Sequence, residues 1–219
     1  MEEKKYILTE ETKAYFCLIL HRIEAARDFS DVKKGDKGGW IESEKNLSHE
    51  GNAWVSGNAW VYGDAKVYGN AKVYGNAWVS GYAKVSGNAK VSGNAKVSGD
   101  AWVSGDAKVS GNAKVSGDAE VCGDAEVCGN AEVYGNAKIE SDKDYIVFKN
   151  WWSSERYFTW TRSNNMWKVG CFYGTGEELI KKAYADSPES GREYERVVRY
   201  VESILKDEDL KSKKESADL

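Results

Sequence analysis

The chain holds only two histidines, His21 and His49, and four cysteines, which are the side chains that catalytic histidine bases and transition-metal sites would need. Acyl-transfer enzymes commonly use a histidine to remove a proton from the nucleophile. Zinc enzymes hold their metal through several histidine or cysteine side chains. Neither histidine lies in a pattern of this kind, and the cysteines are scattered. We therefore expect no catalytic residues, no metal site, no cofactor and no enzymatic activity.

The element that would position any site is a repeat. Glycine recurs every six residues from Gly51 to Gly135, in fifteen consecutive hexads without insertion or deletion. Each hexad reads Gly, Asn or Asp (Tyr82 once), Ala, a variable residue, Val (Ile139 once) and a second variable residue. A short, exact period of this kind predicts a parallel β-helix.

The alternation within one hexad fixes which side chains face inward. Ala and Val are two residues apart, so both point into the solenoid, and the two variable residues point outward. Gly and Asn or Asp turn the corner, where a positive φ is easiest for these residue types. Three hexads then form one triangular coil. A weaker register extends backwards, with Ile41 and Leu47 at Ala positions, so we expect the solenoid to begin near Gly39.

Residues eighteen apart lie above one another on successive coils, which makes each position a column. One turn column contains only asparagine and predicts a ladder of hydrogen-bonded amides, although asparagine also simply suits a turn. The other two turn columns mix in Asp without flanking acidic or histidine ligands, so we expect no metal there. The asparagine column is Asn58, Asn76, Asn94, Asn112 and Asn130.

Outward aromatic side chains surround the first coils. Exposed aromatic residues that cluster usually mark an interface. The alternative is that the N-terminal segment folds over them as a cap, and a stacking platform for carbohydrate or nucleobases is a third possibility. The predicted binding residues in the repeat are Trp54, Trp60, Trp78, Tyr62, Tyr68 and Tyr74.

Two more tryptophans, Trp151 and Trp152, complete the predicted binding residues, because strand alternation leaves one of the pair outward. The N-terminal segment is short and can cover one face of the solenoid but hardly three. The surplus of outward aromatic surface therefore predicts self-association, as a dimer or trimer.

Composition narrows the partners and the compartment. Among 219 residues, 31 are Lys or Arg and 35 are Asp or Glu, for a net charge of −4. This balance excludes a polybasic arm, so nucleic acid is not an expected partner. The longest apolar run, residues 14–20, is far short of a membrane span, and the N-terminus lacks a signal-peptide pattern. We expect a cytoplasmic protein without membrane contact.

The flanking segments differ from the repeat. Residues 4–8 and 15–23 predict strands joined by residues 9–13, which close the N-terminal end of the solenoid. After Glu140 the sequence predicts strands at 144–150, 155–162 and 166–173. Thr175 and Glu178 form a capping box for a helix, and a second helix opens at Ser187–Pro188. The expected domains are an N-terminal β cap at 1–38, the solenoid at 39–140, and a small α+β domain with a charged tail at 141–219.

A family resemblance can now be stated. The GNAxV and GDAxV hexads resemble the left-handed parallel β-helix of hexapeptide-repeat proteins, over about residues 39–140. The implied fold class is mainly β: a hexapeptide solenoid with an N-terminal β cap and a small C-terminal α+β domain. The near-invariant hexads and their flanks also resemble uncharacterised bacteriophage and prophage proteins, which carry polymer-forming or transferase-like labels.

Three functions follow from this resemblance. The first is a non-enzymatic scaffold or binding module, encoded by a phage or prophage. The second is an anti-defence protein that blocks a host immune protein or sequesters a small nucleotide, with Arg156, Arg162, Lys168 and Arg192 supplying charge. The third is a hexapeptide-type acyltransferase, which the absence of a histidine from the repeat disfavours.

Overall fold

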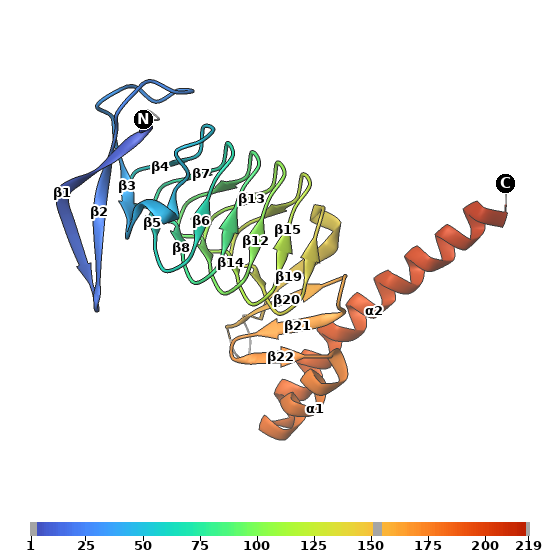
Figure 1. Ribbon diagram of the computed structural model, residues 1–219. Helices are drawn as coiled ribbons and strands as arrows, with labels where there is room; N and C mark the ends of the chain where they lie inside the picture. The colour runs from blue at the N-terminus through green and yellow to red at the C-terminus, as the bar shows by residue number, and fades with distance from the viewer. Residues whose placement is uncertain (1–3, 151–154, 218–219) are drawn as a thin grey trace. The chain divides into compact units, whose positions relative to one another are not determined.

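The computed structural model describes residues 4–150 and 155–217 (Figure 1). The chain divides into two compact units, the first comprising Met1–Ile146 with Thr161–Asn164 and the second Val147–Trp160 with Asn165–Leu219. The first unit is a parallel β-solenoid of about six turns that carries an N-terminal hairpin. None of the helices in the described ranges is both long and apolar enough to span a bilayer.

The N-terminal hairpin joins the solenoid through a shared sheet. Strand β1 (Tyr6–Tyr15) pairs antiparallel with β2 (Leu18–Ala25), and β2 pairs antiparallel with β3 (Lys37–Ile41). Residues 9–13, expected to be a connector, instead continue β1 across a bulge. The chain reverses at Phe16, whose φ is 51°. The expectation that residues 9–13 interrupt the strand was wrong because the bulge hides the alternation.

The repeat forms two-residue strands that stack in three parallel sheets. The sheet orders are β3-β5-β8-β11-β14-β17, β4-β7-β10-β13-β16 and β6-β9-β12-β15-β18, so from β4 onward every third strand is a neighbour. This confirms the predicted coil of eighteen residues. The strands are β4 (Trp54–Val55), β5 (Trp60–Val61), β6 (Lys66–Val67), β7 (Lys72–Val73), β8 (Trp78–Val79), β9 (Lys84–Val85), β10 (Lys90–Val91), β11 (Lys96–Val97), β12 (Trp102–Val103), β13 (Lys108–Val109), β14 (Lys114–Val115), β15 (Glu120–Val121), β16 (Glu126–Val127), β17 (Glu132–Val133) and β18 (Lys138–Ile139).

The solenoid core is made by the inward Ala and Val columns. Every such Ala and Val from Ala53 to Ala137, and Ile139, is fully buried. Each buried Val contributes about 1.5–3 kcal/mol before entropy is counted. The corners need glycine for two reasons: Gly93 has a φ of 65°, and a Cβ there would lie 3.0 Å from the backbone nitrogen of Gly111. The hexad thus specifies both the core and the tight stacking of corners.

The first, irregular coil departs from the expected register. Ile41 pairs with Val61 and Leu47 bridges to Val67, so both occupy Val positions and not Ala positions. A 3₁₀ turn, η1 (Glu44–Asn46), forms the corner between them. Two additional residues precede the first exact coil, because Leu47 is twenty residues from its neighbour whereas later partners are eighteen apart. His49 therefore lies in this added stretch and not at an inward position.

The N-terminal end of the solenoid is closed by side-chain donors. The N–H groups of each coil donate to carbonyl groups of the following coil, as from Trp54 to Ala71. The irregular coil supplies such donors to part of the first exact coil, as from Trp40 to Ala59, and side chains supply others. The amide of Asn46 donates to the carbonyl oxygens of Gly63 and Ala65, each at 2.9 Å. The Lys5 ammonium donates to the carbonyl oxygen of Ala53 at 2.8 Å.

The C-terminal end of the solenoid is closed by side-chain acceptors, since its N–H groups have no following coil. A second 3₁₀ turn, η2 (Asp142–Asp144), supplies two of them. Asp142 accepts from the N–H of Glu126 at 2.8 Å, and Asp144 accepts from that of Glu140 at 2.9 Å. The Ser163 hydroxyl accepts from the N–H of Lys138 at 2.7 Å. Donors at one end and acceptors at the other complete the ladder.

The C-terminal elements form a small α+β arrangement. Thr175 and Glu178 make the predicted capping box. The expected strand at 166–173 is two strands, because the chain turns at Gly170 with a φ of 56°. The expected charged tail is helical to Ala217. The sheet order is β19 (Tyr145–Lys149), β20 (Tyr157–Thr161), β21 (Met166–Val169), β22 (Phe172–Gly174), followed by α1 (Gly176–Asp186) and α2 (Pro188–Ala217).

Candidate functional site

The N-terminal hairpin packs against part of the outward aromatic column. The rings of Trp60 and Trp78 stack with centroids 5.0 Å apart and planes within 2° of parallel. Tyr15, at the end of β1, meets both rings edge-on at 5.1 and 5.5 Å, and its ring lies 5.8 Å from that of Tyr62. Trp60, Trp78 and Tyr62 are therefore half-buried within the chain. For these three residues the structure follows the alternative in which the N-terminal segment folds over the aromatic side chains as a cap.

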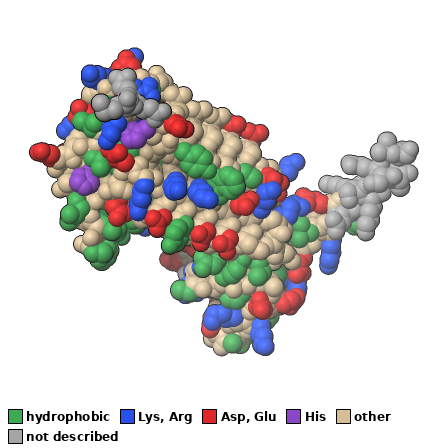
Figure 2. Space-filling view, in the orientation of Figure 1, with side chains coloured by type: hydrophobic (Ala, Val, Ile, Leu, Met, Phe, Trp, Pro, Cys, Tyr) green, Lys and Arg blue, Asp and Glu red, His purple; other side chains and the backbone are tan. Residues whose placement is uncertain are grey.

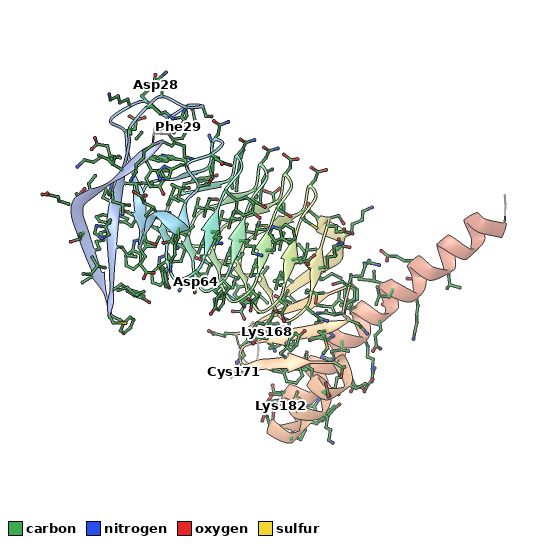
Figure 3. All side chains as sticks on the ribbon, in the orientation of Figure 1. Asp28, Phe29, Asp64, Lys168, Cys171 and Lys182 are labelled. Carbon is green, nitrogen blue, oxygen red and sulfur yellow. The ribbon has the colours of Figure 1, made fainter. Side chains whose placement is uncertain are left out.

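Trp54 is covered more completely, with 7% of its surface exposed. Its ring meets Phe29 at 5.3 Å and Tyr6 at 6.5 Å; Figure 3 labels Phe29 in the loop that follows β2. Tyr74 remains exposed and, with Trp54, borders a shallow groove. Lys72 in that groove is held by Asp31 at 2.7 Å. The predicted residues Trp151 and Trp152 lie outside the described residues.

Three aromatic side chains stay open to solvent along the sheet that contains β6, β9 and β12. Tyr82 is 63% exposed, Trp102 42% and Tyr68 37%. Sequence reasoning did not select Tyr82 or Trp102 as binding residues. The sequence did contain a signal for Tyr82: it is the one turn residue of the fifteen hexads that is neither Asn nor Asp. These three residues, with Asp64, Lys66, Lys84 and Asp100, are here called the aromatic patch.

Charged residues of the aromatic patch border one shallow depression with Tyr82. Lys66 and Lys84 are register neighbours in adjacent strands, and Asp64 and Asp100 precede β6 and β12 at the turn. The indole N–H of Trp102 donates to the Ser86 hydroxyl at 3.1 Å, which fixes the plane of the ring. Figure 3 labels Asp64 at the edge of the solenoid, and Figure 2 shows charged and hydrophobic side chains interspersed on the face that it displays.

The three corners of the solenoid differ in how their outward side chains bond. The predicted asparagine ladder is present, with each amide donating to the next at 3.1 to 3.4 Å from Asn58 to Asn130. A second ladder runs from Asn52 to Asp106. At the third corner, Asp64, Tyr82 and Asp100 form no such bonds with one another in the described part of the chain. The aromatic patch therefore borders a corner at which no ladder links these three residues, and where Asp64 instead accepts from Lys45 at 3.1 Å.

His49 is engaged within the N-terminal cap. Its ring stacks on Tyr6 with centroids 4.2 Å apart, and its Nδ1 accepts from the N–H of Lys5 at 3.3 Å. A neutral imidazole with an accepting Nδ1 carries its proton on Nε2, which faces the Glu44 carboxylate at 3.6 Å. The Lys4 ammonium beside Glu44 holds the pKa of that carboxyl below its usual range. No ring lone pair of His49 is free to accept a substrate proton in this arrangement.

The remaining chemical groups do not converge. Nδ1 of His21 lies 3.4 Å from the carbonyl oxygen of Thr9. The four cysteines are free thiols, and burial raises the pKa of the Cys122 thiol, so it is a poor nucleophile at neutral pH. Within residues 4–150 and 155–217, no three His, Cys, Asp or Glu side chains group as metal ligands.

A cavity in the second unit bears on the nucleotide hypothesis. It holds only about 20 Å³, room for about one water molecule, and is lined by Arg156, Lys182, Phe172 and others, whereas small-molecule pockets usually measure about 300–1,000 Å³. Figure 3 labels Lys182 and Lys168; Lys168 donates to the carbonyl of Gly170 and is not among the lining residues. The basic residues singled out in the sequence thus do not share this cavity.

Comparison with known proteins supports the solenoid. A family model described as the YdcK beta solenoid repeat matches residues 65–81, inside the exact hexads. A protein of Escherichia coli (strain K12), named "Uncharacterized acetyltransferase YdcK", is 40% identical over 60 residues. The match covers 24% of this chain and 18% of that relative, so the chain spans less than a fifth of the relative's length. The resemblance to phage proteins stays a prediction.

The comparison corrects one expectation. The histidine count predicted that the chain is not an enzyme, and the finding that overturns this is the relative's name, acetyltransferase. The number of histidines was a weak basis for that prediction, because glutamate, aspartate, lysine and tyrosine also act as general bases.

Proposed function

We propose that the chain is a β-solenoid scaffold that binds a protein partner through the aromatic patch. The observation that carries this proposal is the contrast in exposure: the hairpin and its following loop cover Trp54, while Tyr82 and Trp102 keep 63% and 42% of their surfaces exposed. Exposed aromatic side chains bordered by charge are typical of interface cores and rims.

Rigidity also supports binding at this site. The strands beneath Lys66, Lys84 and Trp102 are held in register by parallel ladders. Side chains displayed on such a frame lose little backbone entropy when a partner binds, which favours affinity from a small contact.

The test is photo-crosslinking from a benzoylphenylalanine placed at Tyr82, with the same group at Lys90 on another sheet as the matched control. We expect a crosslinked product from position 82 and none from position 90. Mass spectrometry identifies the partner, and the purified partner must then bind parent protein and lose affinity for Trp102→Lys. Equal crosslinking from both positions, or none from either, would contradict the proposal.

The relative's name favours a second function, acyl transfer. His49 would serve as its base only after Nδ1 is released from the N–H of Lys5, since Nδ1 is the accepting ring nitrogen and is otherwise engaged. The measurement is release of coenzyme A from acetyl-CoA with a panel of amine and hydroxyl acceptors. Turnover that disappears in His49→Ala and not in His21→Ala would assign the base; acceptor-dependent turnover unchanged in both would place it elsewhere.

A further inference from the structure

We propose that the groove beside Trp54 and Tyr74 binds one ring of a neutral, polyhydroxylated ligand, of the class of a monosaccharide. The groove lies on the sheet of β4 and β7, and not on the sheet that carries the aromatic patch. The inference therefore does not depend on the proposed function. It is carried by the charge balance, the unpaired hydroxyl groups and the aromatic wall of this groove.

One wall of the groove is a grid of four side chains on the solenoid. Trp54 and Ser56 lie on one coil, and Lys72 and Tyr74 occupy the same two hexad positions on the next coil. Parallel pairing of β4 with β7 sets Trp54 beside Lys72, on coils about 4.8 Å apart. Because ladder bonds hold both strands, these side chains stand on a rigid frame, and binding a ligand costs little backbone entropy.

The opposite wall is the loop that follows β2 (Figure 3). Phe29 and Val32 exchange two backbone hydrogen bonds, at 3.0 and 2.9 Å, which close a tight turn around Asp31. The Phe29 ring packs on Trp54 at 5.3 Å and so holds the turn against the solenoid. The space between the two walls measures about 260 Å³. This lies just below the range of about 300–1,000 Å³ for drug-sized ligands, so the groove suits a ligand of one ring.

The charges of the groove cancel. The Lys72 ammonium lies 2.7 and 2.9 Å from the two carboxylate oxygens of Asp31, and no other described residue that lines the groove is charged. A phosphate would meet no net positive charge here and would compete with Asp31 for the ammonium group. The charge balance therefore disfavours nucleotides and favours a neutral ligand.

The polar groups of the groove can still bond to hydroxyl groups. Within the described ranges, the hydroxyls of Ser56 and Tyr74 have no hydrogen-bond partner. Lys72 uses at most two of its three N–H donors on Asp31, and the Asp31 side chain is 69% exposed. A hydroxyl group both donates and accepts, so ligand hydroxyls can accept from Lys72 and donate to Asp31 while the ion pair stays intact.

An aromatic ring supplies the apolar part of the site. Tyr74 keeps 40% of its surface exposed, and no ring in the described part of the chain packs against it. A sugar ring carries hydroxyl groups at its edge and C–H groups on its faces. One face can therefore pack on Tyr74 while the edge meets the polar groups of the groove, which is the combination of apolar wall and few polar groups typical of ligand sites.

The test is saturation-transfer NMR of the full chain with the methyl glycosides of glucose, galactose, mannose and N-acetylglucosamine. We expect transfer to at least one of them and an affinity about tenfold lower or less in Tyr74→Ser, which removes the aromatic wall. Most hexads carry serine at this position, so thermal unfolding of the variant should match that of the parent. The matched control is Tyr68→Ser, which removes an exposed tyrosine from the same hexad position on another sheet and should leave binding unchanged.

A charge variant tests the neutrality of the groove. Asp31→Asn leaves Lys72 unpaired, so this variant should gain about tenfold in affinity for glucuronate relative to methyl glucoside. Failure of every glycoside to bind, equal losses in Tyr74→Ser and Tyr68→Ser, or a parent that prefers glucuronate would overturn the proposal. None of these results bears on the proposed function, because the crosslink from position 82 reports on a different sheet.

Discussion

The ammonium group of Lys5 donates to the carbonyl oxygen of Ala53 at 2.8 Å and also lies within 3.5 Å of the carbonyl oxygens of Glu50 and Gly51. A lysine thus takes the place of backbone N–H donors that a preceding regular coil would supply. The side chain is fully buried. Desolvation, with a smaller effect of the Arg27 charge, lowers the pKa of Lys5 to about 8.

This pKa predicts a pH dependence of stability. The folded state binds the Lys5 proton less tightly than the unfolded chain, whose lysine titrates near 10.5. Between these values the unfolded chain holds more protons, so the free energy of unfolding should rise with pH, by at most about 3 kcal/mol. Below about pH 8 Lys5 should contribute no slope. The check is denaturant unfolding of the parent and of Lys5→Met from pH 7 to 10.5; equal slopes for both would contradict the assignment.

The two end turns predict a difference between similar residues. Asn46 donates through its amide to two carbonyl groups, and its side chain is buried. Asn46→Asp replaces that donor with a second acceptor and should cost about 3 kcal/mol in the free energy of unfolding. Asp144 only accepts, so Asp144→Asn keeps an acceptor oxygen and should cost less than about 1 kcal/mol. Chemical denaturation of both variants checks this; equal losses would refute the donor and acceptor assignment.

Those end turns show how far sequence could predict the fold. The hexad determines the core because its period alone places Ala and Val inward. The ends are not periodic, yet residues 41–45 and 139–143 share the pattern Ile-Glu-Ser-acid-Lys, followed by Asn46 and Asp144 respectively. That similarity could be found in the sequence. The two added residues before the first exact coil could not, because Ile41 and Leu47 suit the Ala positions and the Val positions of the hexad equally well.

The candidate site was harder to predict for a physical reason. Alternation identifies which aromatic side chains leave the solenoid, but it does not say which ones a distant segment covers. Tyr15 meets Trp60 and Trp78 across more than forty residues of sequence, and only the folded chain shows this contact. Tyr82 did carry a local signal, because it stands where every other hexad has Asn or Asp. The prediction of binding residues considered only the aromatic side chains around the first coils and therefore missed it.

The asparagine ladder predicts that position along a column decides the cost of a substitution. Asn94 both accepts from Asn76 and donates to Asn112, so Asn94→Asp loses a donor and sets two acceptors together. We expect a loss of about 1 kcal/mol. Asn130 accepts from Asn112 at the end of the ladder, and Asn130→Asp should stay within about 0.5 kcal/mol of the parent. Thermal unfolding of the pair decides this; similar losses would mean that the ladder adds nothing beyond turn preference.

The hairpin supplies a further prediction, from two neighbouring aromatic residues with opposite surroundings. Tyr15 packs edge-on against Trp60 and Trp78 and is half-buried, whereas Phe16 is 91% exposed at the reversal. Tyr15→Ala removes the ring that covers the stacked indoles, so it should lower the free energy of unfolding by about 1–3 kcal/mol and expose tryptophan to water.

The matched control is Phe16→Ala, which removes as large a ring one residue away. Phe16 touches Tyr15 at a centroid distance of 4.8 Å but buries little surface, so its loss should change stability by less than about 0.5 kcal/mol. The readouts are denaturant unfolding and tryptophan emission, which should shift to longer wavelength in Tyr15→Ala alone. If the two variants behave alike, the hairpin does not hold the aromatic column as the structure places it, and Trp60 and Trp78 would return as candidates for binding a partner.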